Sequence, residues 1–141
     1  MFKKSITSFV LAIILLLGVL GYCSATPVND DIAEYRVEYK ALLDVLTTQV
    51  ERLDGLQSNL DQGKITPGLE TRRAWDQYKS IYMAVNGQEK VWNRAQQTVA
   101  RNHPNDPMIR KMLAFDKGKY TAKRAAYDVK YEKVGEGLRN L

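Results

Sequence analysis

The sequence contains one cysteine and one histidine in 141 residues, which limits the chemistry open to the chain. Cys23 lies in an apolar N-terminal segment, so the rest of the chain has neither a disulfide nor a thiol nucleophile. His103 lies in a proline-containing turn, away from any helix face that would support a haem ligand. A single histidine without cysteine also provides too few of the usual zinc ligands. We therefore expect no metal and no cofactor.

The usual signatures of catalysis are also missing. The sequence shows no glycine-rich phosphate loop, no serine–histidine–aspartate set and no pair of carboxylates placed to face a pocket. We therefore expect the protein not to be an enzyme, and no small-molecule substrate is indicated.

Residues 1–25 have the composition of a signal peptide. Lys3 and Lys4 precede an apolar stretch over residues 9–20. Small residues just before Thr26 fit the recognition positions of a signal peptidase, so the segment is expected to be cleaved there.

Two alternatives to cleavage stay open. Residues 6–22 are near the minimum length of a membrane-spanning helix, so the segment can remain as an N-terminal anchor. The residues before Cys23 are similar to a bacterial lipobox, apart from Tyr22, so lipidation is the second alternative. In every case residues 26–141 are expected outside the cytoplasm, either secreted or periplasmic, or anchored to the membrane.

Two long segments carry apolar residues at alternating steps of three and four, the a/d pattern of packed helices. In the first segment these are Ile32, Tyr35, Tyr39, Leu42, Leu46, Leu53, Leu56 and Leu60. In the second they are Ala74, Tyr78, Ile81, Val85, Trp92, Ala95 and Val99. The pattern predicts helices at about 30–62 and 67–102, folded into an antiparallel, coiled-coil-like hairpin.

Gln49 and Gln88 interrupt these two rows. A polar residue in such a row can fix the register of the helices at a cost in stability. Asn86 and Gly87 suit a turn, and a break there would give four helices. Because the apolar row continues through them, we predict one continuous helix.

Four residues are predicted to mark helix ends. Asn29 and Thr66 can cap the N-termini of the first two helices, and Asp106 can cap a third helix that begins with Pro107. Gly63 can adopt the left-handed conformation that ends the first helix.

The third helix is predicted over residues 107–134, with Leu113, Tyr120, Tyr127 and Val134 recurring every seven residues. Gly135 and Gly137 predict a flexible tail over 135–141. The predicted fold is thus an all-α, elongated three-helix bundle spanning residues 26–134.

Charge is distributed unevenly along a chain of net charge +5, since the first helix is mainly acidic and the third mainly basic. This favours an interpretation in which the acidic flank of the first helix pairs with the basic flank of the third and so sets the order of the helices. The alternative is a basic face for an anionic polymer or lipid, with aromatic rings between the cations. Its candidate residues are Lys119, Tyr120, Lys123, Arg124, Tyr127, Lys130 and Tyr131. If the face binds no such partner, the helix is simply amphipathic: its tyrosines are half buried, and its lysines lay their stems along apolar surface with the charged ends in solvent.

Taken together, these features predict a non-enzymatic helical binding or scaffold protein outside the cytoplasm. It would act through contacts with a protein partner or with itself, and nucleic acid is not expected as a partner. The alternative is a membrane-tethered structural rod of the cell envelope, if the N-terminal segment is retained. That general layout is similar to the layout of phage lysis spanins.

Overall fold

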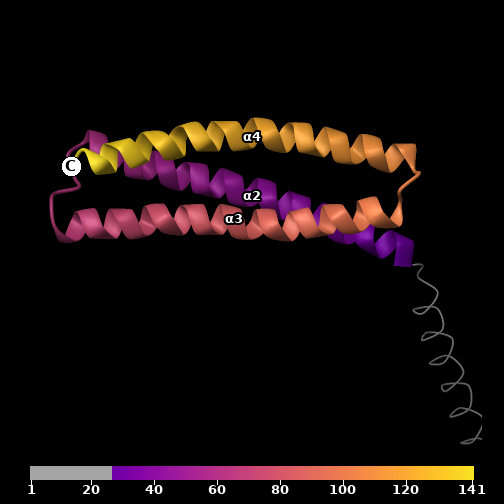
Figure 1. The fold of residues 1–141 in the computed structure, drawn as a ribbon. Helices are drawn as coiled ribbons and strands as arrows, with labels where there is room; N and C mark the ends of the chain where they lie inside the picture. Colours follow the sequence, from indigo (N-terminus) through magenta and orange to yellow (C-terminus); the bar gives the residue numbers. More distant parts are fainter. Residues whose placement is uncertain (1–26) are drawn as a thin grey trace, which may run out of the picture.

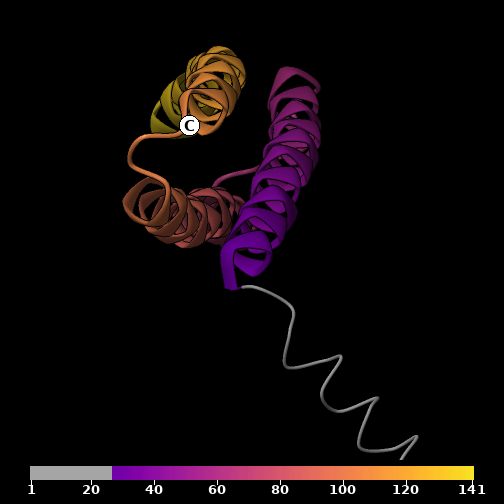
Figure 2. The ribbon, with the colours of Figure 1, turned by 90° about the vertical axis from the view of Figure 1, so that its right-hand side faces the viewer.

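The structure, a computed structural model, describes residues 27–141, with side chains from residue 30 onward. It consists of three helices, α2 (Pro27–Asp61), α3 (Leu69–Asn102) and α4 (Pro107–Arg139). Figure 1 shows an elongated bundle in which α3 runs antiparallel to both α2 and α4. Seen nearly along their axes, the helices lie at the corners of a triangle (Figure 2). The predicted all-α three-helix bundle is confirmed. The predicted signal peptide, anchor and lipidation at Cys23 lie outside the described residues.

The apolar rows of α2 and α3 form most of the core. The fully or almost fully buried members are Tyr35, Leu42, Leu46, Leu53, Leu56, Ala74, Tyr78, Ile81, Val85, Trp92, Ala95 and Val99. Two contacts fix the register of the hairpin: the rings of Tyr39 and Trp92 lie 6.0 Å apart, and Arg52 donates to Ser80 over 3.0 Å. Each fully buried aliphatic side chain contributes roughly 1.5–3 kcal/mol, so this interface is the main source of stability.

The turn between α2 and α3 ends α2 as predicted but begins α3 in a different way. Gly63 has a φ of 64° and ends α2, as predicted. Thr66 does not cap α3. Its backbone N–H and hydroxyl instead donate to the carboxylate of Glu70, over 2.9 and 2.7 Å. Gly68 has a φ of 118°, which no helical residue adopts, so α3 begins only at Leu69.

The first helix begins earlier than predicted. Because α2 starts at Pro27, Asn29 lies within its first turn and is not the residue before it. Proline is well tolerated at this first position, where its missing N–H has no partner in the helix. The second helix passes through Asn86 and Gly87 without a break, which confirms the predicted continuous helix.

Helix α4 begins as predicted and ends later. The side chain of Asp106 accepts hydrogen bonds from the N–H groups of Met108 (2.9 Å) and Ile109 (3.3 Å). The helix then continues to Arg139, so the predicted flexible tail from residue 135 is wrong over most of its length. The reason is packing, because Leu138 is buried against the end of the hairpin and holds the last turn in place.

Candidate functional site

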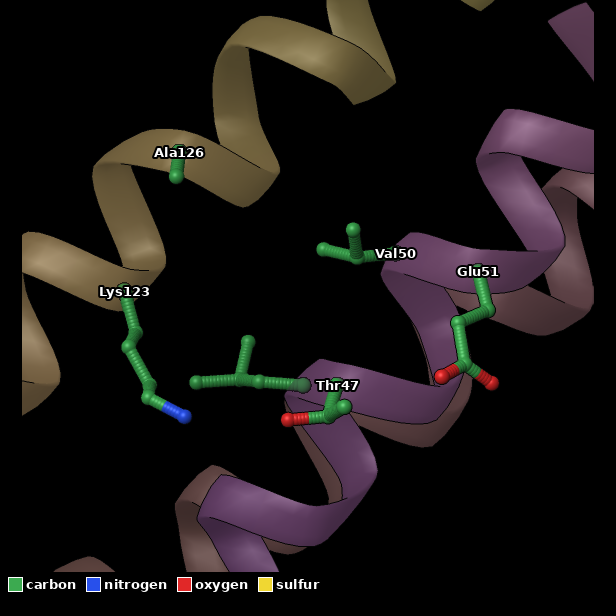
Figure 3. A pocket seen from close by; sticks show the side chains of 6 residues that line it. Thr47, Val50, Glu51, Lys123 and Ala126 are labelled. Carbon is green, nitrogen blue, oxygen red and sulfur yellow. The ribbon is translucent and has the colours of Figure 1, made fainter.

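A groove runs between the parallel helices α2 and α4. Its main hollow has a volume of about 360 Å³ and is shown in Figure 3. The hollow is lined by Leu46, Thr47, Val50, Glu51, Lys123 and Ala126. A smaller hollow of about 160 Å³ lies further along the same two helices. It is lined by Leu53, Asp54, Gln57, Lys130, Lys133 and Val134.

The groove exists because the residues that meet across it are short. Ala126 of α4 offers only a single methyl group to the hollow. Opposite it, Val50 and Thr47 of α2 are β-branched and cannot reach far from their own helix. The floor is therefore apolar and accessible, and it is wide enough for a side chain of a partner.

The two rims of the groove carry opposite charges. Figure 3 shows Glu51 on the α2 side and the amino group of Lys123 on the α4 side. Further along, Asp54 of α2 accepts from Lys130 of α4, and Lys133 adds a second cation to the α4 side. The acidic first helix and basic third helix noted in the sequence thus become the two walls of one groove.

The seven predicted polyanion-binding residues do not share one surface. Tyr127 is fully buried, and Tyr131 stacks on Tyr78 with ring centroids 4.0 Å apart. Tyr120 packs on Trp92 at 4.9 Å and donates to Glu89. Burial and this carboxylate raise the pKa of Tyr120 to about 12.

The predicted cations of α4 are also partly engaged within the bundle. Arg124 pairs with Glu89 of α3 and with Asp128 of its own helix, while Lys130 pairs with Asp54. Lys119 and Lys123 are exposed, and Lys119 lies over the ring of the exposed Phe115. Binding of an anionic polymer stays a prediction, with two exposed lysines as its remaining charged groups.

The two glutamines in the apolar rows bond to α2 side chains. Gln49 is buried and accepts from Arg52 over 2.9 Å, and the same guanidinium reaches Ser80 of α3. Gln88 of α3 donates to the carboxylate of Glu38 over 2.8 Å. The Arg52–Ser80 and Gln88–Glu38 bonds join α2 to α3 at two levels. A role of the two glutamines in fixing the register stays a prediction.

Two polar clusters were not predicted from the sequence. In the first, the carboxylate of Asp116 accepts from the hydroxyl of Tyr35 over 2.9 Å, and its backbone carbonyl accepts from Tyr39 over 3.2 Å. Burial is the main cause that raises the pKa of Tyr35, and the hydrogen bond to Asp116 raises it further. The sequence does contain a signal for this cluster. Asp116 lies three residues after Leu113, so its side chain is expected on the inner face of α4.

The second cluster closes the end of the bundle. Asp31 of α2 accepts from Asn102 over 2.9 Å and contacts Nε2 of His103 at 3.2 Å. Burial acts to raise the pKa of Asp31, but the hydrogen bonds from Asn102 and His103 outweigh it and the pKa is lowered. His103 therefore has a structural partner in Asp31, which is distant in the sequence and which the position of His103 in a proline turn did not reveal.

Neither cluster has the composition of a metal centre. Within the part of the chain that the structure describes, no three histidine, cysteine, aspartate or glutamate residues are grouped so that they could hold a metal ion. The helices α2, α3 and α4 also lack any stretch apolar enough to cross a lipid bilayer. No protein-family model matches the chain, and no curated protein or solved structure matches it.

Proposed function

We propose that the protein is a non-enzymatic binding or scaffold protein outside the cytoplasm, and that it holds a protein partner in the groove between α2 and α4. The observation that carries this proposal is the apolar groove itself, which lies between two parallel helices and has opposite charges on its rims. Grooves of this form accept the apolar face of a helix, which anchors through side chains spaced three or four residues apart.

The apolar floor and the charged rims contribute in different ways. Contact with Leu46, Val50 and Ala126 removes apolar surface from water, which stabilises a complex by roughly 25 cal/mol per Å². The charges of Glu51 and Lys123 would set the orientation of the partner and speed its approach more than they add affinity.

Site-specific photo-crosslinking in cells that express the full chain tests the proposal. A photoreactive phenylalanine analogue at Thr47, on the α2 rim of the groove, should give one dominant crosslinked protein. The same analogue at Val37, which is exposed on α2 and is not part of the groove lining, is the matched control and should give none.

A second variant connects the adduct to the groove. Ala126→Trp fills the hollow and should abolish the Thr47 adduct, while far-UV circular dichroism and the midpoint of thermal unfolding stay close to those of the unmodified chain. The proposal fails if Thr47 gives no adduct, or if Thr47 and Val37 give the same products.

A membrane-tethered rod is the second candidate. It is supported by the length of the bundle and by the position of the start of α2 at one of its two tips. At 1.5 Å per residue, the 35 residues of α2 span roughly 50 Å, and Pro27 lies at one tip. If the residues before Thr26 are retained as an anchor, the opposite tip would stand away from the bilayer by that distance. Sequencing the N-terminus of the mature protein decides, since a start at Thr26 excludes the tether and a retained Met1 supports it.

A further inference from the structure

Helix α4 carries a second apolar row beside the groove, in addition to the one it buries. Met108, Phe115, Ala122 and Val129 follow one another at intervals of seven. Three of them are large and exposed, at 72% for Met108, 62% for Phe115 and 69% for Val129. Ala126, in the groove lining, lies on the same side of α4, between Ala122 and Val129. A seven-residue repeat is the pattern that a helix offers to another long helix, so this face has the form of an unused helix-packing surface.

The charges beside this row favour one way of pairing two copies. In the groove, the α2 rim carries Glu51 and the α4 rim carries Lys123. A two-fold axis parallel to the helices sets α2 of one copy against α4 of the other, so that each acidic rim meets a basic rim. An axis perpendicular to the helices would set α4 against α4 and bring its lysines together, which costs free energy.

We propose that the occupant of the groove is a second copy of this chain, in a symmetric dimer with parallel helices. The inference rests on the proposed function, because it names the partner of the same groove. Within one chain, Asp54 contacts Lys130, so residues 76 apart lie at the same level of α2 and α4. Glu51 therefore lies level with Tyr127, one helical turn from Lys123. In the parallel dimer this places Glu51 of each copy within a turn of Lys123 of the other.

A charge-exchange experiment on the full chain tests the dimer. Two differently tagged copies are co-expressed, both with the photoreactive analogue at Thr47. The unmodified pair should give a crosslinked species of about twice the mass of the mature chain. Glu51→Lys alone and Lys123→Glu alone should each lower its yield at least threefold, because like charges then meet twice in the dimer.

Co-expression of the Glu51→Lys copy with the Lys123→Glu copy should restore the yield, and the restored species should carry both tags. Lys79→Glu, a charge reversal on the exposed surface of α3, is the control and should leave the yield unchanged. A restored mixed dimer supports the proposal, and two charge reversals that do not rescue each other overturn it.

The remaining outcomes separate this proposal from the proposed function. A dominant adduct with a different protein overturns the dimer and leaves the binding function intact. Absence of any adduct from Thr47 contradicts both. Circular dichroism of each variant checks that a lost adduct does not come from an unfolded chain.

Discussion

Tyr35 and Tyr127 are both fully buried, but their hydroxyl groups have different surroundings. The hydroxyl of Tyr35 donates to the carboxylate of Asp116, whereas that of Tyr127 has no partner among the described residues. Tyr35→Phe should therefore lower the free energy of unfolding by roughly 1.5–3 kcal/mol, the usual value of a hydrogen bond to a charged group. Tyr127→Phe should leave it unchanged or raise it by up to about 1 kcal/mol, because no bond is lost. Urea denaturation followed by circular dichroism measures both, and equal losses would contradict the assignment.

Asp31 gives the stability of the bundle an acid-dependent contribution. Its pKa is lowered in the folded chain, because the hydrogen bonds from Asn102 and His103 outweigh the effect of burial. A lowered pKa stabilises the fold fully above the unfolded value, near 3.9, and this contribution is lost as pH falls through the folded pKa. Asp31→Asn should thus destabilise the protein clearly at pH 6 and much less at pH 2.5. Urea denaturation at the two pH values tests this, and a loss independent of pH would contradict it.

Two glycines of α4 should respond in opposite directions to the same substitution. A Cβ at Gly118 meets nothing within 4 Å, so Gly118→Ala should stabilise by about 0.8–1.0 kcal/mol through helix propensity. A Cβ at Gly135 would clash with the hydroxyl oxygen of Tyr78. That hydroxyl is held by its hydrogen bond to the carbonyl of Tyr131, 3.0 Å away, so Gly135→Ala should destabilise by roughly 1–3 kcal/mol. Thermal unfolding of both variants provides the comparison, and stabilisation at Gly135 would show that the Tyr78 ring moves freely.

The helices could be predicted from the sequence because their spacing of apolar residues is local information. The rows of α2 and α3 identified the buried residues, and the cap at Asp106 fixed the start of α4. The end of α4 could not be predicted from its own residues. Gly135 and Gly137 have low helix propensity, but the contacts of Leu138 and Gly135 with other helices keep this segment helical.

The groove could not be predicted for a related reason. Whether Ala126 leaves a hollow depends on how α4 is rotated against α2, and that rotation follows from the packing of all three helices. The burial of the tyrosines among the candidate polyanion residues could not be predicted for the same reason, since the sequence alone does not say which side of α4 its tyrosines face. Tyr127 faces the core, and Tyr120 and Tyr131 pack against aromatic residues of α3.

Because the described part of the molecule has an odd number of helices, its two chain ends lie at opposite tips of the bundle. Pro27 lies at one tip, while the chain ends at the other tip, beside the turn from α2 to α3 (Figure 1). The two ends of the described chain are therefore separated by roughly 50 Å, the length of α2 at 1.5 Å per residue. A pair of fluorophores at Asp30 and Asn140 should report this long separation, whereas a pair at Gln62 and Asn140 should show efficient energy transfer. If α4 swings away from α2, the second signal falls first, so the two pairs together measure the opening of the bundle.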